Sequence, residues 1–208
     1  MMEAHIVCGG PDLWLPEKLG GLIVGVDRGA LALIERNINF DTVIGDFDSV
    51  SEAQRLMIKD RVTFFVDLPA EKDVTDCEAA VEHVVNLGIK KIYLYGVSGG
   101  RFDHQFAIIG LMLKYRKMDI EICSIDEKNQ ISILAPGDYQ IPSMEKKYVS
   151  FFALERTVKH LTLEMVKYPL KGYELAVSDS LCVSNEPLKQ WFGLKFDSSY
   201  LLMVQSSD

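Results

Sequence analysis

Short apolar runs with little polar alternation dominate the first 126 residues. They are rich in valine, isoleucine and aromatic residues, which is typical of strands buried on both faces. The runs cover residues 6–8, 22–26, 42–44, 62–66, 92–95 and 120–125. Helical patterns lie between several of them, over residues 30–36, 51–59, 76–87 and 104–115. This alternation predicts a mostly parallel sheet with helices on its faces.

The helix expected over residues 76–87 has the clearest pattern. Its apolar residues fall on one face at helical spacing. Thr75 and Glu78 have the spacing of a capping box at its start. Gly88 suits its C-terminal end, so both boundaries of this helix are predicted.

The pattern changes after residue 126. Turn signals at 136–138 and 141–143 are followed by β-like runs, without a convincing helix. These runs cover residues 148–154, 160–165, 181–183, 191–196 and 200–204. The fold class is therefore α/β, with an N-terminal parallel sheet and flanking helices followed by a C-terminal antiparallel β-sandwich. We expect domains over residues 1–128 and 129–208, with the boundary somewhere in 126–137.

Composition narrows the function classes. The chain has 208 residues and a net charge of −8, which disfavours a general nucleic-acid binder. It has no signal-peptide pattern and no apolar run long enough for a membrane span, so we expect a protein of the cytoplasm. Cys8, Cys77, Cys123 and Cys182 are far apart in sequence. Without zinc-ligand spacing, they indicate free thiols in a reducing compartment.

Several aspartates follow the predicted strands directly. Asp27 follows the run 22–26, and Asp46 and Asp48 follow 42–44. Ligands of open parallel sheets bind beyond the carboxyl ends of the strands. If residues 46–48 are extended, both carboxylates face the same way, as Mg²⁺ coordination would need. The alternative is that Asp46 or Asp48 merely caps the next helix.

Two further segments carry candidate chemistry. Asp73 and Asp76 straddle the start of the helix 76–87, where an acid is also favoured by the helix dipole alone. The turn Ser98-Gly99-Gly100 offers backbone N–H groups to an anion, and Arg101 could clamp phosphate. Gly9-Gly10 offers a second close backbone approach, unless it is a simple turn. The chain lacks the P-loop, the dinucleotide-binding fingerprint and the nucleophile elbow.

In combination, these segments resemble the thiamine pyrophosphokinase family. The matching stretches are Val26-Asp27-Arg28-Gly29-Ala30, Gly45-Asp46-Phe47-Asp48-Ser49, Lys72-Asp73-Val74-Thr75-Asp76, Ser98-Gly99-Gly100-Arg101-Phe102-Asp103-His104, Lys167-Tyr168-Pro169-Leu170 and Ser184-Asn185-Glu186. The resemblance implies a nucleotide-binding α/β domain followed by a thiamine-binding β-sandwich. It also implies a homodimer with thiamine in a cleft between subunits. The implied reaction transfers diphosphate from ATP to the thiamine hydroxyl, giving thiamine diphosphate and AMP.

The resemblance also implies roles around the nucleotide. Mg²⁺ would be held by Asp46, Asp48 and Asp73, with Asp76 close by. Phosphates would be contacted by Arg101 and by Ser98, Gly99 and Gly100. Asp27 would help shape the nucleotide side, while Asp103 and His104 would orient substrate or the Ser98–Gly100 turn. The general base is left open between Asp73, Asp103 and water.

For thiamine, the resemblance implies stacking on Tyr168 and hydrogen bonds from Ser184 and Asn185. The alternatives are packing for Tyr168 and an ordinary turn for the other two residues. This chain departs from the family pattern at Ile108, where asparagine is usual, and at Met165-Val166, where a glycine usually precedes the lysine. Two rival functions fit the residues alone: an Asp-x-Asp phosphatase, and a non-catalytic nucleotide- or thiamine-binding protein.

Overall fold

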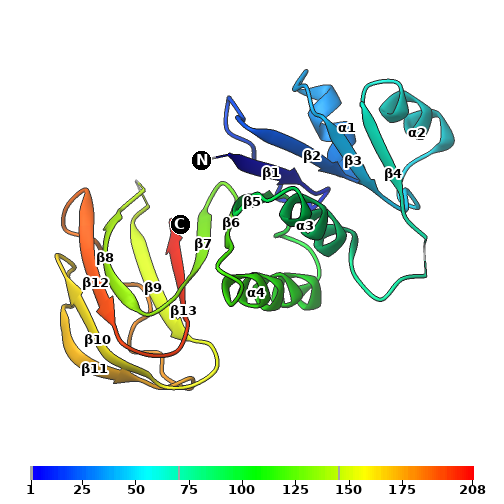
Figure 1. Cartoon of the computed structure of the whole chain (residues 1–208). Coiled ribbons are helices and arrows are strands. Elements are labelled where there is room, and N and C mark those ends of the chain that lie inside the picture. The colour runs from blue at the N-terminus through cyan, green and yellow to red at the C-terminus, as the bar shows by residue number, and fades with distance from the viewer. Residues whose placement is uncertain (1, 70, 145) are drawn as a thin grey trace. The chain divides into compact units, whose positions relative to one another are not determined.

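The computed structural model describes residues 2–69, 71–144 and 146–208. The chain divides into two compact units, residues 1–127 and 128–208 (Figure 1). This division falls one residue before the boundary expected from the sequence. None of the helices in the described ranges is long and apolar enough to cross a membrane.

The first unit is built on a parallel sheet with strand order β4-β3-β2-β1-β5-β6. Its strands are β1 (Glu3–Val7), β2 (Leu22–Val26), β3 (Thr42–Gly45), β4 (Phe64–Asp67), β5 (Lys91–Tyr95) and β6 (Glu121–Ile125). All six correspond to apolar runs seen in the sequence. The mostly parallel sheet is therefore confirmed.

The helices of this unit are α1 (Arg28–Glu35), α2 (Glu52–Lys59), α3 (Asp76–Asn86) and α4 (Phe102–Arg116). Helices α1 and α2 cover one face of the sheet, and α3 and α4 lie on the other (Figure 1). Ser51 caps α2 in a complete capping box with Gln54. Thr75 caps α3 by accepting a hydrogen bond from the Glu78 N–H, as the sequence predicted.

The second unit is a β-sandwich, which confirms the antiparallel fold class. One sheet has strand order β7-β13-β9, and the other has the order β11-β10-β12-β8. The strands are β7 (Asn129–Leu134), β8 (Gly137–Pro142), β9 (Tyr148–Ala153), β10 (Val158–Glu164), β11 (Leu170–Leu175), β12 (Trp191–Phe196) and β13 (Leu201–Ser206). Phe151, Phe192 and Phe196 are fully buried between the sheets, where they form the centre of the core.

The strands of this unit were only partly predicted. Residues 181–183 form a turn and not a strand, and β7, β8 and β11 were not expected. The turn signals near Pro142 lie at the end of strand β8. Because β8 is the last strand of its sheet, the missing N–H of Pro142 costs no ladder hydrogen bond there. Strand β11 also lies at an edge, and Gly172 with φ +66° interrupts its pattern.

Candidate active site

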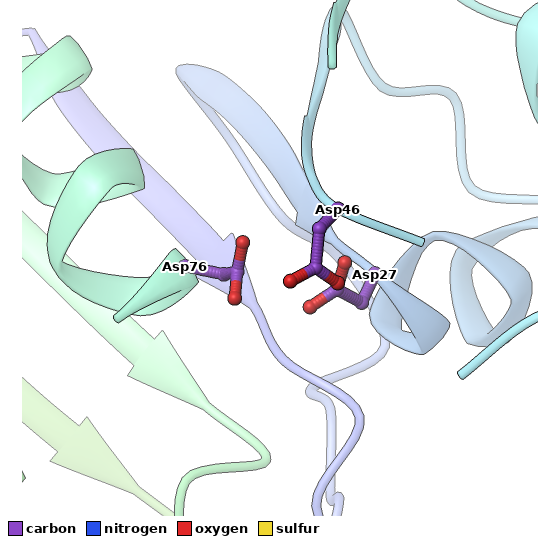
Figure 2. Close-up of side chains that lie close together, drawn as sticks. All are labelled: Asp27, Asp46 and Asp76. Atoms are coloured by element: carbon purple, nitrogen blue, oxygen red, sulfur yellow. The ribbon is translucent and has the colours of Figure 1, made fainter. Parts of the chain in front are cut away.

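Three carboxylates gather at the carboxyl edge of the parallel sheet. Asp27 follows β2, Asp46 follows β3, and Asp76 is the first residue of α3. Each offers an oxygen, and these oxygens all lie within 4.8 Å of one another. Figure 2 shows Asp27 and Asp46 converging, with Asp76 facing them from the start of its helix. The parallel topology thus brings together side chains that are up to 49 residues apart in sequence.

Gly45 makes room for this cluster. A Cβ atom at Gly45 would lie 1.8 Å from Oδ1 of Asp27, so only glycine permits the observed position of that carboxylate. The same oxygen accepts a hydrogen bond of 3.2 Å from the N–H of Phe47. The loops after β2 and β3 are therefore joined through the Asp27 side chain.

The segment 46–48 is not extended. The condition under which both carboxylates would face the same way is therefore not met. Phe47 has φ +57° and its ring is buried, while the Asp48 N–H donates to Oδ1 of Asp46 over 3.2 Å. Neither aspartate caps α2, because Ser51 does so. Within the described ranges, Asp48 and Asp73 are not part of the three-carboxylate cluster. Asp48 lines the adjacent cavity, and Asp73 is exposed. Their role as metal ligands stays a prediction.

Two carboxyl groups of the cluster, Asp27 and Asp46, have pKa values shifted in opposite directions. Burial raises the pKa of Asp27 from 3.8 to about 6, and the charge of Asp76 adds to the rise. A hydrogen bond from the Lys72 ammonium lowers the pKa of Asp46. The two carboxyl groups therefore differ in proton affinity. Asp46 has a cationic partner, whereas among the residues that the structure describes Asp27 faces the Phe47 N–H and anionic neighbours.

Lys72 belongs to a motif singled out from the sequence, but its contacts with two carboxylates were not expected. Its Nζ lies 3.0 Å from Oδ2 of Asp46 and 3.1 Å from Oδ1 of Asp76. Burial alone would lower the pKa of Lys72, but the two carboxylates outweigh this effect and raise it. The signal was its place in Lys72-Asp73-Val74-Thr75-Asp76, four residues before Asp76.

The donor set suits a hard divalent cation. It consists of carboxylate oxygens, the ligands that Mg²⁺ takes in proteins. Oδ1 of Asp76 is buried and accepts no aligned hydrogen bond from the residues that the structure describes. This oxygen is paired with the Lys72 ammonium at 3.1 Å but lacks an aligned donor. A cation at the cluster would satisfy it.

A cavity of about 540 Å³ opens beside the carboxylates, within the first unit. Asp27, Asp48 and Asp76 are among the residues that line it. Further lining comes from the two glycine turns and the residues after them, namely Gly9, Gly10, Ser98, Gly100, Arg101 and His104. The cavity therefore joins the acidic cluster to the predicted anion-binding turns.

The two glycine turns are tied to each other. The Gly10 N–H donates to the Gly96 carbonyl over 2.8 Å, and a Cβ at Gly10 would lie 2.3 Å from that oxygen. Gly99 has φ +80°, a conformation that glycine adopts without strain. The Ser98 hydroxyl lines the cavity and is buried with no hydrogen-bond partner among the described residues. It is free to donate to an anionic ligand.

Arg101 is held in place by the residue two positions later. Its guanidinium makes a two-pronged contact with the Asp103 carboxylate, with Nε 3.1 Å from Oδ1. Asp103 also accepts the N–H of His104, while Gln105 donates to the Gly100 carbonyl over 3.2 Å. Gln105 was not singled out from the sequence. Asp103 thus positions Arg101 at the start of α4.

The predicted thiamine residues lie together in the second unit. Tyr168 is 60% exposed, so its ring is not core packing, and the Lys167 Nζ lies 5.5 Å from the ring centroid. The buried Asn185 amide accepts the Tyr168 N–H and donates to the Tyr168 carbonyl. Ser184 is exposed with φ +57°. Asn185 therefore fixes the backbone that presents the Tyr168 ring.

Comparisons with protein families match both units. Residues 18–124 match the family described as "Thiamin pyrophosphokinase, catalytic domain". Residues 138–201 match the family described as "Thiamin pyrophosphokinase, vitamin B1 binding domain". Together these matches cover most of the chain.

Individual relatives agree with this. The chain is 34% identical to thiamine pyrophosphokinase of Bacillus subtilis (strain 168) over 214 residues, with both chains fully covered. A crystal structure of the Bacillus subtilis enzyme has a TM-score of 0.91, with 33% identity over 99% of each chain. A structure from Geobacillus thermodenitrificans has a TM-score of 0.87 and 34% identity, over 100% of this chain and 98% of that one. A yeast thiamin pyrophosphokinase structure, 16% identical over 99% of this chain and 86% of that one, shares the fold with a TM-score of 0.77.

Proposed function

The chain belongs to the thiamin pyrophosphokinase family and is an enzyme of that type, and we propose how its residues divide the work. The reaction transfers a diphosphate group from ATP to the thiamine hydroxyl and releases AMP. Such transfers need positioning and neutralisation of charge more than covalent help from the protein.

The observation that carries this proposal is the three-carboxylate cluster beside the cavity. Asp27, Asp46 and Asp76 would hold Mg²⁺. Asp48 and Asp73, two and three residues from Asp46 and Asp76 in sequence, would contribute directly or through water. Bound Mg²⁺ supplies neutralisation of the charge on the phosphate oxygens. The buried Asp76 oxygen without an aligned hydrogen bond supports this assignment.

The glycine turns would receive the phosphates of ATP. The Ser98 hydroxyl, the backbone around Gly100 and the Arg101 guanidinium line the cavity and would supply donors. Gly9 and Gly10, in the turn bonded to Gly96, would allow close approach of the backbone. Asp103 acts through Arg101 by holding its guanidinium, and His104 lines the same cavity.

Thiamine would bind in the second unit. The exposed Tyr168 ring offers a stacking surface. Asn185 fixes the Tyr168 backbone, and Ser184 directly precedes Asn185 in the chain. Exposed apolar side chains of the same unit, among them Val177, Leu181 and Leu188, support a homodimer with the thiamine cleft between subunits. Light scattering tests the dimer, and a monomer at micromolar concentration would contradict it.

We further propose a reducing, cytoplasmic location. All four cysteines are free thiols, and two of them, Cys8 and Cys182, are buried. Free buried thiols persist where disulfide formation is disfavoured.

The function is tested by incubating the full chain with ATP, Mg²⁺ and thiamine and separating the nucleotide products. We expect AMP in step with loss of thiamine. Asp46→Asn should abolish this turnover while the far-ultraviolet circular dichroism spectrum is retained. Asp119→Asn, at an exposed surface position, is the matched control.

Each rival function has its own outcome in this assay. Inorganic phosphate released without thiamine would support the Asp-x-Asp phosphatase. Tight nucleotide binding with no turnover would support a non-catalytic binding protein. Turnover by Asp46→Asn at the wild-type rate would contradict the assignment of this carboxylate.

A further inference from the structure

The Lys72 ammonium is held by the same carboxylates that form the candidate metal site. Besides its contacts with Asp46 and Asp76, its Nζ donates to the Pro69 carbonyl over 3.2 Å. The Lys72 and Asp46 side chains are each only 13% exposed. This largely buried ammonium donates hydrogen bonds to Asp46 and to the Pro69 carbonyl, and its contact with Asp76 is an ion pair without hydrogen-bond alignment.

An ammonium and a divalent cation compete for these oxygens. Both are positively charged, and like charges a few ångströms apart repel strongly at a largely buried site. A cation bound by Asp46 and Asp76 therefore requires the Lys72 ammonium to move away. Without a new anionic partner, that movement leaves a lysine charge unpaired in the site, which is unfavourable.

The triphosphate of the nucleotide is the partner that the site makes available. Lys72 is in the segment that leads into α3, and the N-terminus of that helix favours anions. A lysine has a flexible four-carbon stem and pairs with phosphate as a point charge. Of the two arginines that line the cavity, Arg28 and Arg101, the second is already held by Asp103.

We propose that Lys72 couples metal binding to nucleotide binding. Its ammonium stays with Asp46 and Asp76 until both ligands are present, and then pairs with the triphosphate. The proposal deepens the proposed function and rests on it. Its consequence is that metal alone binds weakly, nucleotide alone binds weakly, and each strengthens the other.

The experiment measures binding and not turnover. Mn²⁺ replaces Mg²⁺ so that free metal is counted by electron paramagnetic resonance. The nucleotide is an ATP analogue with a methylene bridge between the α- and β-phosphorus atoms, which cannot undergo the transfer. Its affinity is measured with and without Mn²⁺ for the wild type, Lys72→Met and Lys72→Arg. Lys90→Met, which removes an exposed lysine of the same unit, is the matched control.

For Lys72→Met we expect Mn²⁺ alone to bind at least about fivefold more tightly than to the wild type. The factor by which Mn²⁺ strengthens analogue binding should fall at least about fivefold. Metal binding by the analogue in solution is common to all variants and cancels in this comparison. Lys72→Arg should keep most of the coupling, and Lys90→Met should match the wild type.

If Lys72 only orders the carboxylates, Lys72→Met will bind Mn²⁺ more weakly than the wild type, and the proposal is wrong. An unchanged coupling factor also overturns it. If the wild type binds no Mn²⁺ even with the analogue, the metal site assigned in the proposed function is wrong, whatever the role of Lys72. The two failures are therefore distinguishable.

Discussion

Phe47 and Phe65 stack with their ring centroids 4.6 Å apart, which anchors the loop that carries Asp46. The Arg55 guanidinium lies 5.8 Å from the Phe47 centroid and 5.9 Å from that of Phe65, and pairs with Asp67. Phe47 has φ +57°, a conformation that residues with a Cβ rarely adopt. Burial of its ring stabilises this backbone and with it the direction of Asp46.

The first prediction follows from the backbone of Phe47. Loss of its buried ring should destabilise the protein by about 3–5 kcal/mol. Because glycine adopts positive φ without strain, Phe47→Gly should be about 1 kcal/mol less destabilising than Phe47→Ala. Urea unfolding measures both variants. Both should lose turnover, since the loop around Asp46 loses its anchor.

Phe65 supplies the matched control for this order. It lies within β4, where glycine is unfavourable relative to alanine. There the order should reverse, with Phe65→Gly the less stable variant. If alanine were the better residue at both positions, the left-handed conformation of Phe47 would not be a source of strain.

The second prediction concerns the proton affinity of Asp27. Its folded pKa of about 6 lies above the ordinary 3.8, so the folded state binds the proton more tightly. Stability therefore falls as pH rises from about 4 to about 6, and the full cost is present above that range. The shift corresponds to at most about 3 kcal/mol, which solvent screening of a partly exposed group lowers to about 1–2 kcal/mol.

Asp27→Asn keeps an oxygen that can accept the Phe47 N–H and removes the charge. Without metal, it should be more stable than the wild type by about 1–2 kcal/mol at pH 7.5. The advantage should shrink towards pH 4.5, where the wild-type carboxyl is protonated in the folded state. Urea unfolding in EDTA at both pH values measures this. A constant difference, or a less stable variant at pH 7.5, would contradict the raised pKa.

Much of the first unit follows from local pattern. Buried parallel strands have continuous apolar runs, and the sequence order of strands and helices then determines which residues reach the carboxyl edge. Asp27 and Asp46 could be placed there for that reason. The direction of each carboxylate could not, because it depends on the positive φ of Phe47 and on the space left by Gly45.

The second unit was harder to predict for a related reason. Strands β8 and β11 are edge strands, where proline, glycine and exposed polar residues are tolerated and the alternating pattern is weak. Lys72 illustrates a different limit. Its spacing of four residues from Asp76 was visible in the motif, but its contact with Asp46 is a property of the tertiary structure.

The third prediction concerns His5, a buried residue between two tyrosines. Its ring stacks on Tyr93 and Tyr95 with centroids 5.0 and 5.8 Å away, and its Nδ1 lies 3.1 Å from the Tyr95 hydroxyl. Burial lowers the pKa of His5 below its usual 6.5. The unfolded chain then binds the proton more tightly, so stability falls as pH drops below about 6.5.

His5→Phe keeps the stacking and cannot be protonated. At pH 7.5 it should be less stable than the wild type by about 1 kcal/mol, because the hydrogen bond to Tyr95 is lost. As pH falls to 5.5 the difference in free energy of unfolding should narrow, because only the wild type loses stability through protonation of His5. Thermal unfolding across this range measures the two curves. Parallel curves would show that His5 does not titrate differently in the folded state.

The fourth prediction tests whether Gly45 determines the position of Asp27. In Gly45→Ala, the added methyl group would meet Oδ1 and Cγ of Asp27 at 1.8 and 2.7 Å. The carboxylate must rotate away and lose its hydrogen bond with the Phe47 N–H. We expect AMP formation to fall at least about 100-fold, because a shift of about 1 Å at a catalytic group has effects of that size. Overpacking should cost about 1–3 kcal/mol of stability.

A double-mutant cycle separates this contact from general damage to β3. In an Asp27→Gly background the side chain that clashes is absent, and glycine suits the positive φ of residue 27. Gly45→Ala should then be nearly neutral for stability, giving a coupling energy of about 1–3 kcal/mol. Gly110→Ala, with nothing within 4 Å of its added Cβ in α4, should keep full activity. Equal destabilisation by Gly45→Ala in both backgrounds would mean that the strand, and not the Asp27 carboxylate, requires glycine here.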